Sequence, residues 1–187
     1  MTFHKPAAFV DLHSRGELPH LHTPGCSFFI TFRLRDAVES SGHPPALLPA
    51  DIDVSAVLAM AEPPLCLGSC ALASPRLAHI VADALRHFDG RRYTLHAWCV
   101  MPNHVHVVAT PWHQLSQITH SWKSYTANLL NKELGWQGAF WERESFDHLI
   151  RSEQSFERFI HYTEANPVIA GLCSQPGEWM FSSACGR

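Results

Sequence analysis

Two histidines alternate with apolar residues in the segment Asn103-His104-Val105-His106-Val107. Successive side chains of a β-strand point to opposite faces, so on a strand both imidazoles share one face and both valines point the other way, toward a core. Two imidazoles at positions i and i+2 can hold one divalent metal ion together. The spacing alone also allows two polar residues on a solvated strand face, because the motif is short and the chain contains 14 histidines.

A candidate nucleophile, Tyr125, lies in the helical segment His120-Ser121-Trp122-Lys123-Ser124-Tyr125. Tyr125 and Asn128 are three residues apart and share a helix face. The pKa of a tyrosine phenol is ordinarily about 10, so attack needs activation or a strongly electrophilic target. A phosphate polarised by a metal at the two histidines is such a target. The pattern alone equally describes a packing residue of an amphipathic helix.

Aromatic and basic residues occur together in Phe140-Trp141-Glu142-Arg143, and Asp147-His148 follows shortly after. This combination suits base stacking and phosphate contact with a single nucleic acid strand. The alternative is that Trp141 belongs to a core and that the arginines are ordinary surface charges.

The elements that must position these residues follow from periodicity, capping and turn signals. Strands are predicted over 27–34, 91–100, 104–110 and 146–150, and helices over 75–88, 115–134 and 152–165. Met101-Pro102-Asn103 is expected to be a turn, so that the strands on either side of it pair antiparallel. Asn166-Pro167 is expected to end the last helix. Helices packed on a mostly antiparallel sheet define an α+β fold.

The chain has 187 residues, which is the size of a single domain over 1–187. An acidic, proline-rich insertion at about 37–73, with a short helical pattern over 52–61, looks like an excursion from that domain. The net charge of -3 is not typical of a DNA-binding protein. Residues 36–75 hold five of the acids and no Lys or Arg, so the rest of the chain has 14 basic and 12 acidic residues and leaves room for a local basic surface.

The sequence predicts a cytoplasmic protein that does not associate with membranes. No apolar run is long enough to cross a bilayer, and the first residues lack a signal peptide. The six cysteines are therefore expected to be reduced. Cys66 and Cys70 have no second pair with which to bind zinc. A phosphate loop of the G-x-x-x-x-G-K type is also missing, which argues against a nucleotide cofactor.

Several ordered motifs resemble one family, the REP-associated tyrosine transposases, a branch of the IS200-like transposase superfamily of HUH single-strand endonucleases. The resemblance rests on ITFRLRD, LHAWCVMPNHVHVVATP, HSWKSYTANLLNK, FWERESFDHLIRSEQSFERFIHYTEANPVIAGL and GEWMFSSA. It covers residues 17–184 or so and is weakest at about 37–73. Several motifs in order within one chain are much more specific than any one of them.

The resemblance implies an HUH palm, a central antiparallel β-sheet with packed α-helices. It implies that His104 and His106 bind Mg2+ or Mn2+ and that Tyr125 attacks a phosphodiester of single-stranded DNA, forming a 5′-phosphotyrosine link during DNA transposition. Some HUH enzymes take a third metal ligand four residues beyond the nucleophile. That position is Leu129 here, which cannot bind a metal, so Asn128 is the candidate.

The implied partner is single-stranded DNA that carries REP palindromes folded as hairpins. The sequence leaves monomer and dimer both open. The residues considered for DNA contact are basic or aromatic, namely Arg33, Trp122, Lys123, Arg143, His148 and Arg151.

Two other functions remain as hypotheses. The first is a regulator of the same fold that binds hairpin DNA without cutting it, although such a protein has no need of His104, His106 and a tyrosine nucleophile together. The second is a metal-dependent hydrolase of small phosphate esters, which would form no covalent DNA adduct.

Overall fold

The structure is a computed structural model that describes residues 11–14, 19–22, 25–37 and 68–186. The predicted helix over 52–61 lies outside these residues. A central antiparallel sheet has the strand order β4-β5-β3-β6, and a separate pair, β1-β2, lies apart from it. The strands are β1 (Asp11–Ser14), β2 (Pro19–His22), β3 (Phe28–Arg33), β4 (Tyr93–Val100), β5 (His104–Pro111) and β6 (Phe146–Leu149). The helices are α2 (Pro75–His87), α3 (Leu115–Leu134) and α4 (Glu153–Ile169). The α+β prediction is confirmed.

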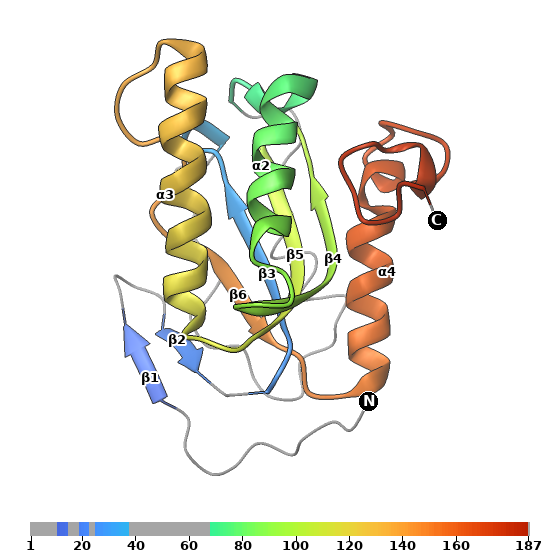
Figure 1. Ribbon diagram of the computed structural model, residues 1–187. Coiled ribbons are helices and arrows are strands. Elements are labelled where there is room, and N and C mark those ends of the chain that lie inside the picture. The colour runs from blue at the N-terminus through green and yellow to red at the C-terminus, as the bar shows by residue number, and fades with distance from the viewer. Residues whose placement is uncertain (1–10, 15–18, 23–24, 38–67, 187) are drawn as a thin grey trace.

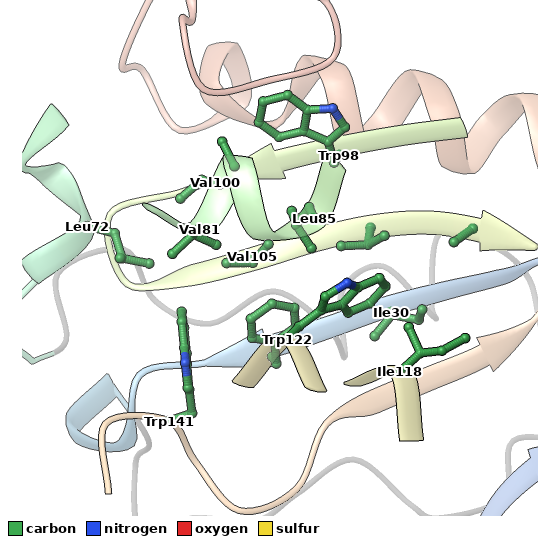
Figure 2. Close-up of a cluster of buried hydrophobic side chains, with 14 of the residues drawn as sticks. Ile30, Leu72, Val81, Leu85, Trp98, Val100, Val105, Ile118, Trp122 and Trp141 are labelled. Atoms are coloured by element: carbon green, nitrogen blue, oxygen red, sulfur yellow. The ribbon is translucent and has the colours of Figure 1, made fainter. Parts of the chain in front are cut away.

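Helices cover both faces of the sheet. Figure 1 shows α2 and α3 side by side, and α4 apart from them. The core under α2 and α3 contains Ile30, Val105, Leu85 and Trp122 (Figure 2). A second cluster joins Phe159 of α4 to Phe29 and Val108 on the opposite face of the sheet. The sheet is therefore the middle layer of three.

The turn at Met101-Pro102-Asn103 joins β4 to β5, as the sequence predicts. The Met101 amide donates to the His104 carbonyl at 2.9 Å, and the Leu34 amide donates to the Asn103 carbonyl at 2.8 Å. These bonds fix where β5 begins beside β3. They also set which way the side chains of His104 and His106 point.

The end of α4 differs from the sequence prediction. We expected Asn166-Pro167 to end the helix near Ala165, but α4 continues through Pro167 to Ile169. A proline inside a helix costs about 3 kcal/mol because it cannot donate to the carbonyl four residues earlier. Asn166 and Pro167 are both buried, and the packing of this last turn offsets that cost.

The C-terminal segment ties α4 to the edge strand β4. The Val100 amide donates to the Phe181 carbonyl, and the Ser183 amide donates to the Trp98 carbonyl, both at 2.8 Å. The Ser183 hydroxyl donates to the Glu164 carboxylate of α4 at 2.8 Å. The exposed edge of β4 is thereby covered, and α4 is held against its face of the sheet.

The structure also bears on the sequence expectations about the cysteines and about membrane-spanning helices. The five cysteines among them are all free thiols. None of the helices in the described part of the chain combines the length and the apolar character that crossing a membrane requires.

Candidate active site

The two histidines of β5 lie on the α4 face of the sheet and touch each other. Their Nε2 atoms are 3.0 Å apart, and their ring centroids are 4.6 Å apart with the planes at 74°. Both side chains are fully buried, whereas Val105 and Val107 point into the other core. The predicted common face is confirmed, and the alternative of a solvated strand face is wrong.

Each imidazole is oriented through its Nδ1 atom. His104 Nδ1 lies 2.7 Å from Asn103 Oδ1, and His106 Nδ1 lies 2.8 Å from Thr31 Oγ1. A carboxamide oxygen only accepts, so His104 carries its proton on Nδ1 and keeps the lone pair of Nε2 for a ligand. The Thr31 hydroxyl both donates and accepts, so it is compatible with the same arrangement at His106. This is how metal-binding histidines are commonly held.

The geometry of the pair fits one divalent metal ion. Two nitrogen ligands about 2.1 Å from an ion and at right angles to each other are about 3.0 Å apart. The distance between the two Nε2 atoms is 3.0 Å. The described residues contain no cluster of three or more His, Cys, Asp or Glu side chains that could hold a metal. A third ligand from this part of the chain would therefore be a neutral oxygen, such as a carboxamide.

A tyrosine of α4 packs against one of the two histidines, His106. The Tyr162 ring is 5.5 Å from the His106 ring, with the planes at 67°, and 6.0 Å from the Phe29 ring. Its side chain is half-buried. The Tyr162 ring therefore packs beside His106, on the face of the sheet that carries both imidazoles.

Asn166 lies one helical turn beyond Tyr162 and is 1% exposed. The ring of Phe156 packs on His96 and that of Tyr162 on His106, so α4 advances along the sheet toward His104. Four helical residues rise about 6 Å, and two strand residues span about 6.6 Å. Asn166 is therefore level with His104. Its position four residues after a tyrosine is the spacing that the family resemblance implies for a third metal ligand.

The sequence prediction for the nucleophile needs correction, because Tyr125 and Asn128 lie on α3, across the sheet from the histidines. Tyr125 is 57% exposed. Together with Ile80, Phe88 and Leu129 it lines a hollow of about 340 Å³ between α2 and α3. Asn128 is exposed on the same helix. The structure does not bring either residue to His104 and His106.

Trp122 also needs correction, since we considered it for DNA contact. Its side chain is 3% exposed, and its indole N–H donates to the Tyr93 hydroxyl at 2.9 Å. Figure 2 shows Trp122 inside the hydrophobic cluster. Trp141 is likewise a core residue, and its indole N–H donates a hydrogen bond to Thr126 Oγ1 at 2.8 Å. Neither indole presents a ring face to a base.

Two of the candidate DNA contacts share the face of the histidine pair. Arg33 lies directly across from His104 in the β3–β5 register. His148 lies across from Phe29 in the β3–β6 register, and its ring is 5.5 Å from Phe159. Burial, together with the charge of Arg151, lowers the pKa of His148 to about 4. His148 is therefore neutral near pH 7 and adds no positive charge there.

The remaining candidates lie elsewhere. Lys123 and Arg143 meet on the outer side of α3, where the Lys123 ammonium donates to the Arg143 carbonyl at 2.8 Å. Arg151 is exposed just before α4 begins.

Sequence reasoning missed Tyr162 and Asn166, although a signal was present. The two residues have i and i+4 spacing within Tyr162-Thr163-Glu164-Ala165-Asn166. Ending the predicted helix at Ala165 left Asn166 outside it and concealed that spacing.

Comparison with known proteins gives a family and a fold. The family model described as "Transposase IS200 like" matches residues 73–166, half of the chain. The REP-associated tyrosine transposase of Escherichia coli (strain K12) is 30% identical over 97 residues, which are 50% of this chain and 55% of that protein. The match thus spans little more than half the length of this relative.

A solved structure, described as the REP-associated tyrosine transposase bound to a REP hairpin, aligns with 91% of this chain and 81% of its own. Its TM-score is 0.55 and its sequence identity is 17%, so this likeness shows the fold alone.

Proposed function

This chain belongs to the IS200-like transposase family, and we propose that it is a metal-dependent nickase and strand transferase for single-stranded DNA. One observation carries the proposal. The Tyr162 ring packs against His106, one of two buried imidazoles whose Nε2 atoms are 3.0 Å apart, on the same face of the sheet. A phenol, a two-histidine metal site and a carboxamide one turn away form a set suited to phosphoryl transfer.

In this proposal Tyr162 takes the place of Tyr125 as nucleophile. The Tyr162 oxygen attacks the scissile phosphorus and loses its proton to water. The bond from phosphorus to the 3′ oxygen breaks, and that oxygen takes up a proton to become a free 3′-OH. The 5′-phosphate stays covalently attached to Tyr162. Attack by a 3′-OH on this link restores the phosphodiester and frees the phenol, so joining needs no nucleotide cofactor.

His104 and His106 would hold the metal, and Asn166 would replace Asn128 as the third protein ligand. A divalent ion there, Mg2+ or Mn2+, would stabilise negative charge on the scissile phosphate. The carboxamide oxygen of Asn166 is a ligand type that such ions accept. Asn103 and Thr31 contact the two Nδ1 atoms, and the two Nε2 atoms lie 3.0 Å apart, a separation that suits a shared ion. Because both imidazoles are fully buried, a phosphate reaches them only when the groups that cover them move aside.

The substrate in this proposal is a REP-type palindrome folded as a hairpin beside the cleaved bond. Two features support this choice, namely the family membership of the chain and the solved structure of the same fold, whose protein is bound to a REP hairpin. Arg33 lies across from His104 and is the nearest cation of the three strands β3, β4 and β5, so it is suited to meet the DNA backbone beside the cut.

The deciding experiment compares two tyrosines in one assay. Labelled single-stranded DNA carrying the palindromic repeats beside the gene is incubated with Mn2+ or Mg2+ and analysed on denaturing gels. The parent protein and Tyr125→Phe should both give a metal-dependent, protein-linked band. Tyr162→Phe should give none while still binding the DNA. Tyr125→Phe is the matched control because it removes the same hydroxyl from the other face of the sheet.

Other outcomes identify the rival functions. Loss of the band in Tyr125→Phe and its survival in Tyr162→Phe would return the nucleophile to α3. Binding without any adduct, across several metals and flanking sequences, would make the chain a hairpin-binding regulator. Turnover of small phosphate esters without a DNA adduct would make it a hydrolase.

A further inference from the structure

A polar hollow of about 450 Å³ lies on the outer side of α3, away from the histidine pair. One wall is the first half of α3, and the other is the loop that leads into the edge strand β6. Its lining residues are Ser116, Thr119, His120, Lys123, Arg143, Glu144 and Ser145. The volume falls in the range of small-ligand sites, about 300–1,000 Å³. The hollow beside Tyr125 includes the apolar side chains of Ile80, Phe88 and Leu129, whereas this one has no large apolar side chain in its lining.

Lys123 is fixed at the base of this hollow. Its ammonium donates to the carbonyls of Arg143 at 2.8 Å and of Glu144 at 3.2 Å. An ammonium has three N–H groups, so these two bonds leave a third donor. Holding a lysine in place beforehand removes part of the entropy that a flexible surface lysine loses on binding an anion.

The rim adds positive charge and hydroxyl groups. The Arg143 side chain is 84% exposed, and its Nε lies 3.8 Å from the largely buried Glu144 carboxylate. Glu144 therefore holds the guanidinium near the hollow by a weak ion pair. His120, Ser116 and Ser145 provide further polar groups from both walls. Among the lining residues the two cations outnumber the one carboxylate, Glu144, and although Glu142 also acts on the Lys123 ammonium, the exposed Arg143 guanidinium faces solvent and can meet an anion.

We infer that this hollow binds a backbone phosphate of the DNA substrate, at a second contact remote from the bond that is cut. The inference rests on the proposed function for its choice of ligand. Phosphate suits the site because Lys and Arg together with hydroxyls are the common donors to nucleic acid backbones. The hollow lies on the α3 side of the sheet beside β6, whereas the histidine pair lies on the α4 side. A DNA that occupies both contacts passes around the β6 edge.

The experiment measures binding alone, so it does not depend on cleavage. All variants are made in Tyr162→Phe protein and assayed in EDTA with the hairpin DNA over a series of salt concentrations. Arg143→Gln and the double variant His120→Gln/Arg143→Gln alter exposed side chains and leave the Lys123 bonds in place. Arg91→Gln, an exposed arginine in the turn before β4, is the matched control for loss of one positive charge. Thermal unfolding confirms that each variant is folded.

Arg143→Gln should weaken binding roughly fivefold and lower the salt slope by about one, because one phosphate contact is lost. Arg91→Gln should leave both unchanged. Inorganic phosphate or a nucleoside monophosphate, added at constant ionic strength, should compete poorly with the DNA. The DNA is held at several contacts, whereas a small phosphate makes only the one in the hollow.

Equal binding by Arg143→Gln, the double variant and Arg91→Gln would overturn the second contact. Strong competition by free phosphate that disappears in Arg143→Gln would instead make the hollow a small-anion site and contradict its assignment to DNA. Either result leaves the Tyr162 adduct of the parent protein untouched. Conversely, a parent without any adduct but with the Arg143 effect would refute the nickase and retain the binding site.

Discussion

The face of the central sheet under α2 and α3 buries mainly hydrocarbon, whereas the face under α4 buries imidazole, hydroxyl and carboxamide groups among phenylalanines. On the first face the polar atoms of Trp122 and Tyr93 satisfy each other, and the Tyr93 hydroxyl donates to the Leu85 carbonyl at 2.6 Å. On the second face the Nε2 atoms of His104 and His106 lie 3.0 Å apart, and each ring contacts a polar group through its Nδ1 atom.

The difference indicates what each face is for. Burying a polar group costs free energy unless it is well paired, so a core built for stability alone uses few of them. Two adjacent buried imidazoles, each contacted at its Nδ1 atom, cost free energy if they serve only packing, but they are well suited to binding a cation. Substitutions on the α4 face should therefore mainly reduce DNA cleavage, whereas substitutions on the face under α2 and α3 should mainly lower the free energy of unfolding.

The largest expected effect is on the α4 face. His106→Gln should reduce metal-dependent adduct formation by about 10³-fold or more, because a bound ion contributes several kcal/mol of charge stabilisation. The rate of adduct formation at saturating Mn2+ measures this loss. His113→Gln, an exposed histidine in the loop before α3, is the control and should cleave at close to the parental rate. A His106→Gln protein as active as the parent would remove the metal site from the proposal.

The next effect is on the other face. Trp122→Ala should lower the free energy of unfolding by about 3–5 kcal/mol, because it empties a buried aromatic site and leaves the Tyr93 hydroxyl without its donor. Urea denaturation measures the change. Tyr125→Ala, three residues along the same helix but exposed, should change the free energy of unfolding by less than about 1 kcal/mol. Equal losses from the two variants would contradict the distinction between core and surface on α3.

Much of the difference between the faces could be predicted from the sequence. Period-two alternation predicted that His104 and His106 lie on one side of β5. The helical spacing of apolar residues over 115–134, followed by Gly135, predicted both ends of α3. The stripe Leu115, Ile118, Trp122 faces the core. Tyr125 lies seven residues after Ile118 and three after Trp122, so its spacing places it at the edge of that stripe and did not predict that it is 57% exposed.

The face of the sheet that each helix covers could not be predicted in this way. Periodicity shows which side of an element is buried but not which face of a distant sheet it covers. The structure is needed to show that α3 packs on the face of the sheet that carries Val105, whereas α4 packs on the face that carries His106. Pro167 added a second error, because a local rule ended α4 before Asn166, whereas tertiary packing carries the helix through.

A smaller effect, on Mn2+ affinity, should distinguish Asn166 of α4 from Asn128 of α3. Asn166→Ala should weaken Mn2+ binding by about 10- to 100-fold if its carboxamide completes the metal site, a loss of the size seen when groups supporting a metal are removed. Asn128→Ala on α3 should leave Mn2+ binding unchanged. Mn2+ affinity can be measured by calorimetry or electron paramagnetic resonance on protein without DNA. Equal affinities in the two variants would exclude Asn166 as a ligand.

Thr31→Val sharpens the comparison within the α4 face. The substitution keeps the shape of the side chain but removes the hydroxyl that lies 2.8 Å from His106 Nδ1. Mn2+ affinity should fall by about tenfold, since the imidazole loses the group that orients it. Thr126→Val, whose hydroxyl donates to the Trp122 carbonyl on α3, provides the control and should bind Mn2+ normally. An unchanged affinity in Thr31→Val would show that the strand alone orients His106.

The smallest effect concerns the hollow beside α3 and depends on pH. Burial lowers the pKa of Lys123 to about 8, while the carboxylates of Glu142 and Glu144 oppose that shift. The facing groups are His120 on α3 and Arg143 with the two glutamates on the loop. Below pH 8 the ammonium is charged and can hold a phosphate, and its charge is lost as the pH rises through that value. Affinity for hairpin DNA should therefore fall a few-fold between pH 7 and pH 9, and Lys123→Arg, which stays charged, should flatten the profile. Equal pH profiles for the two proteins would show that Lys123 supports the loop and not the DNA.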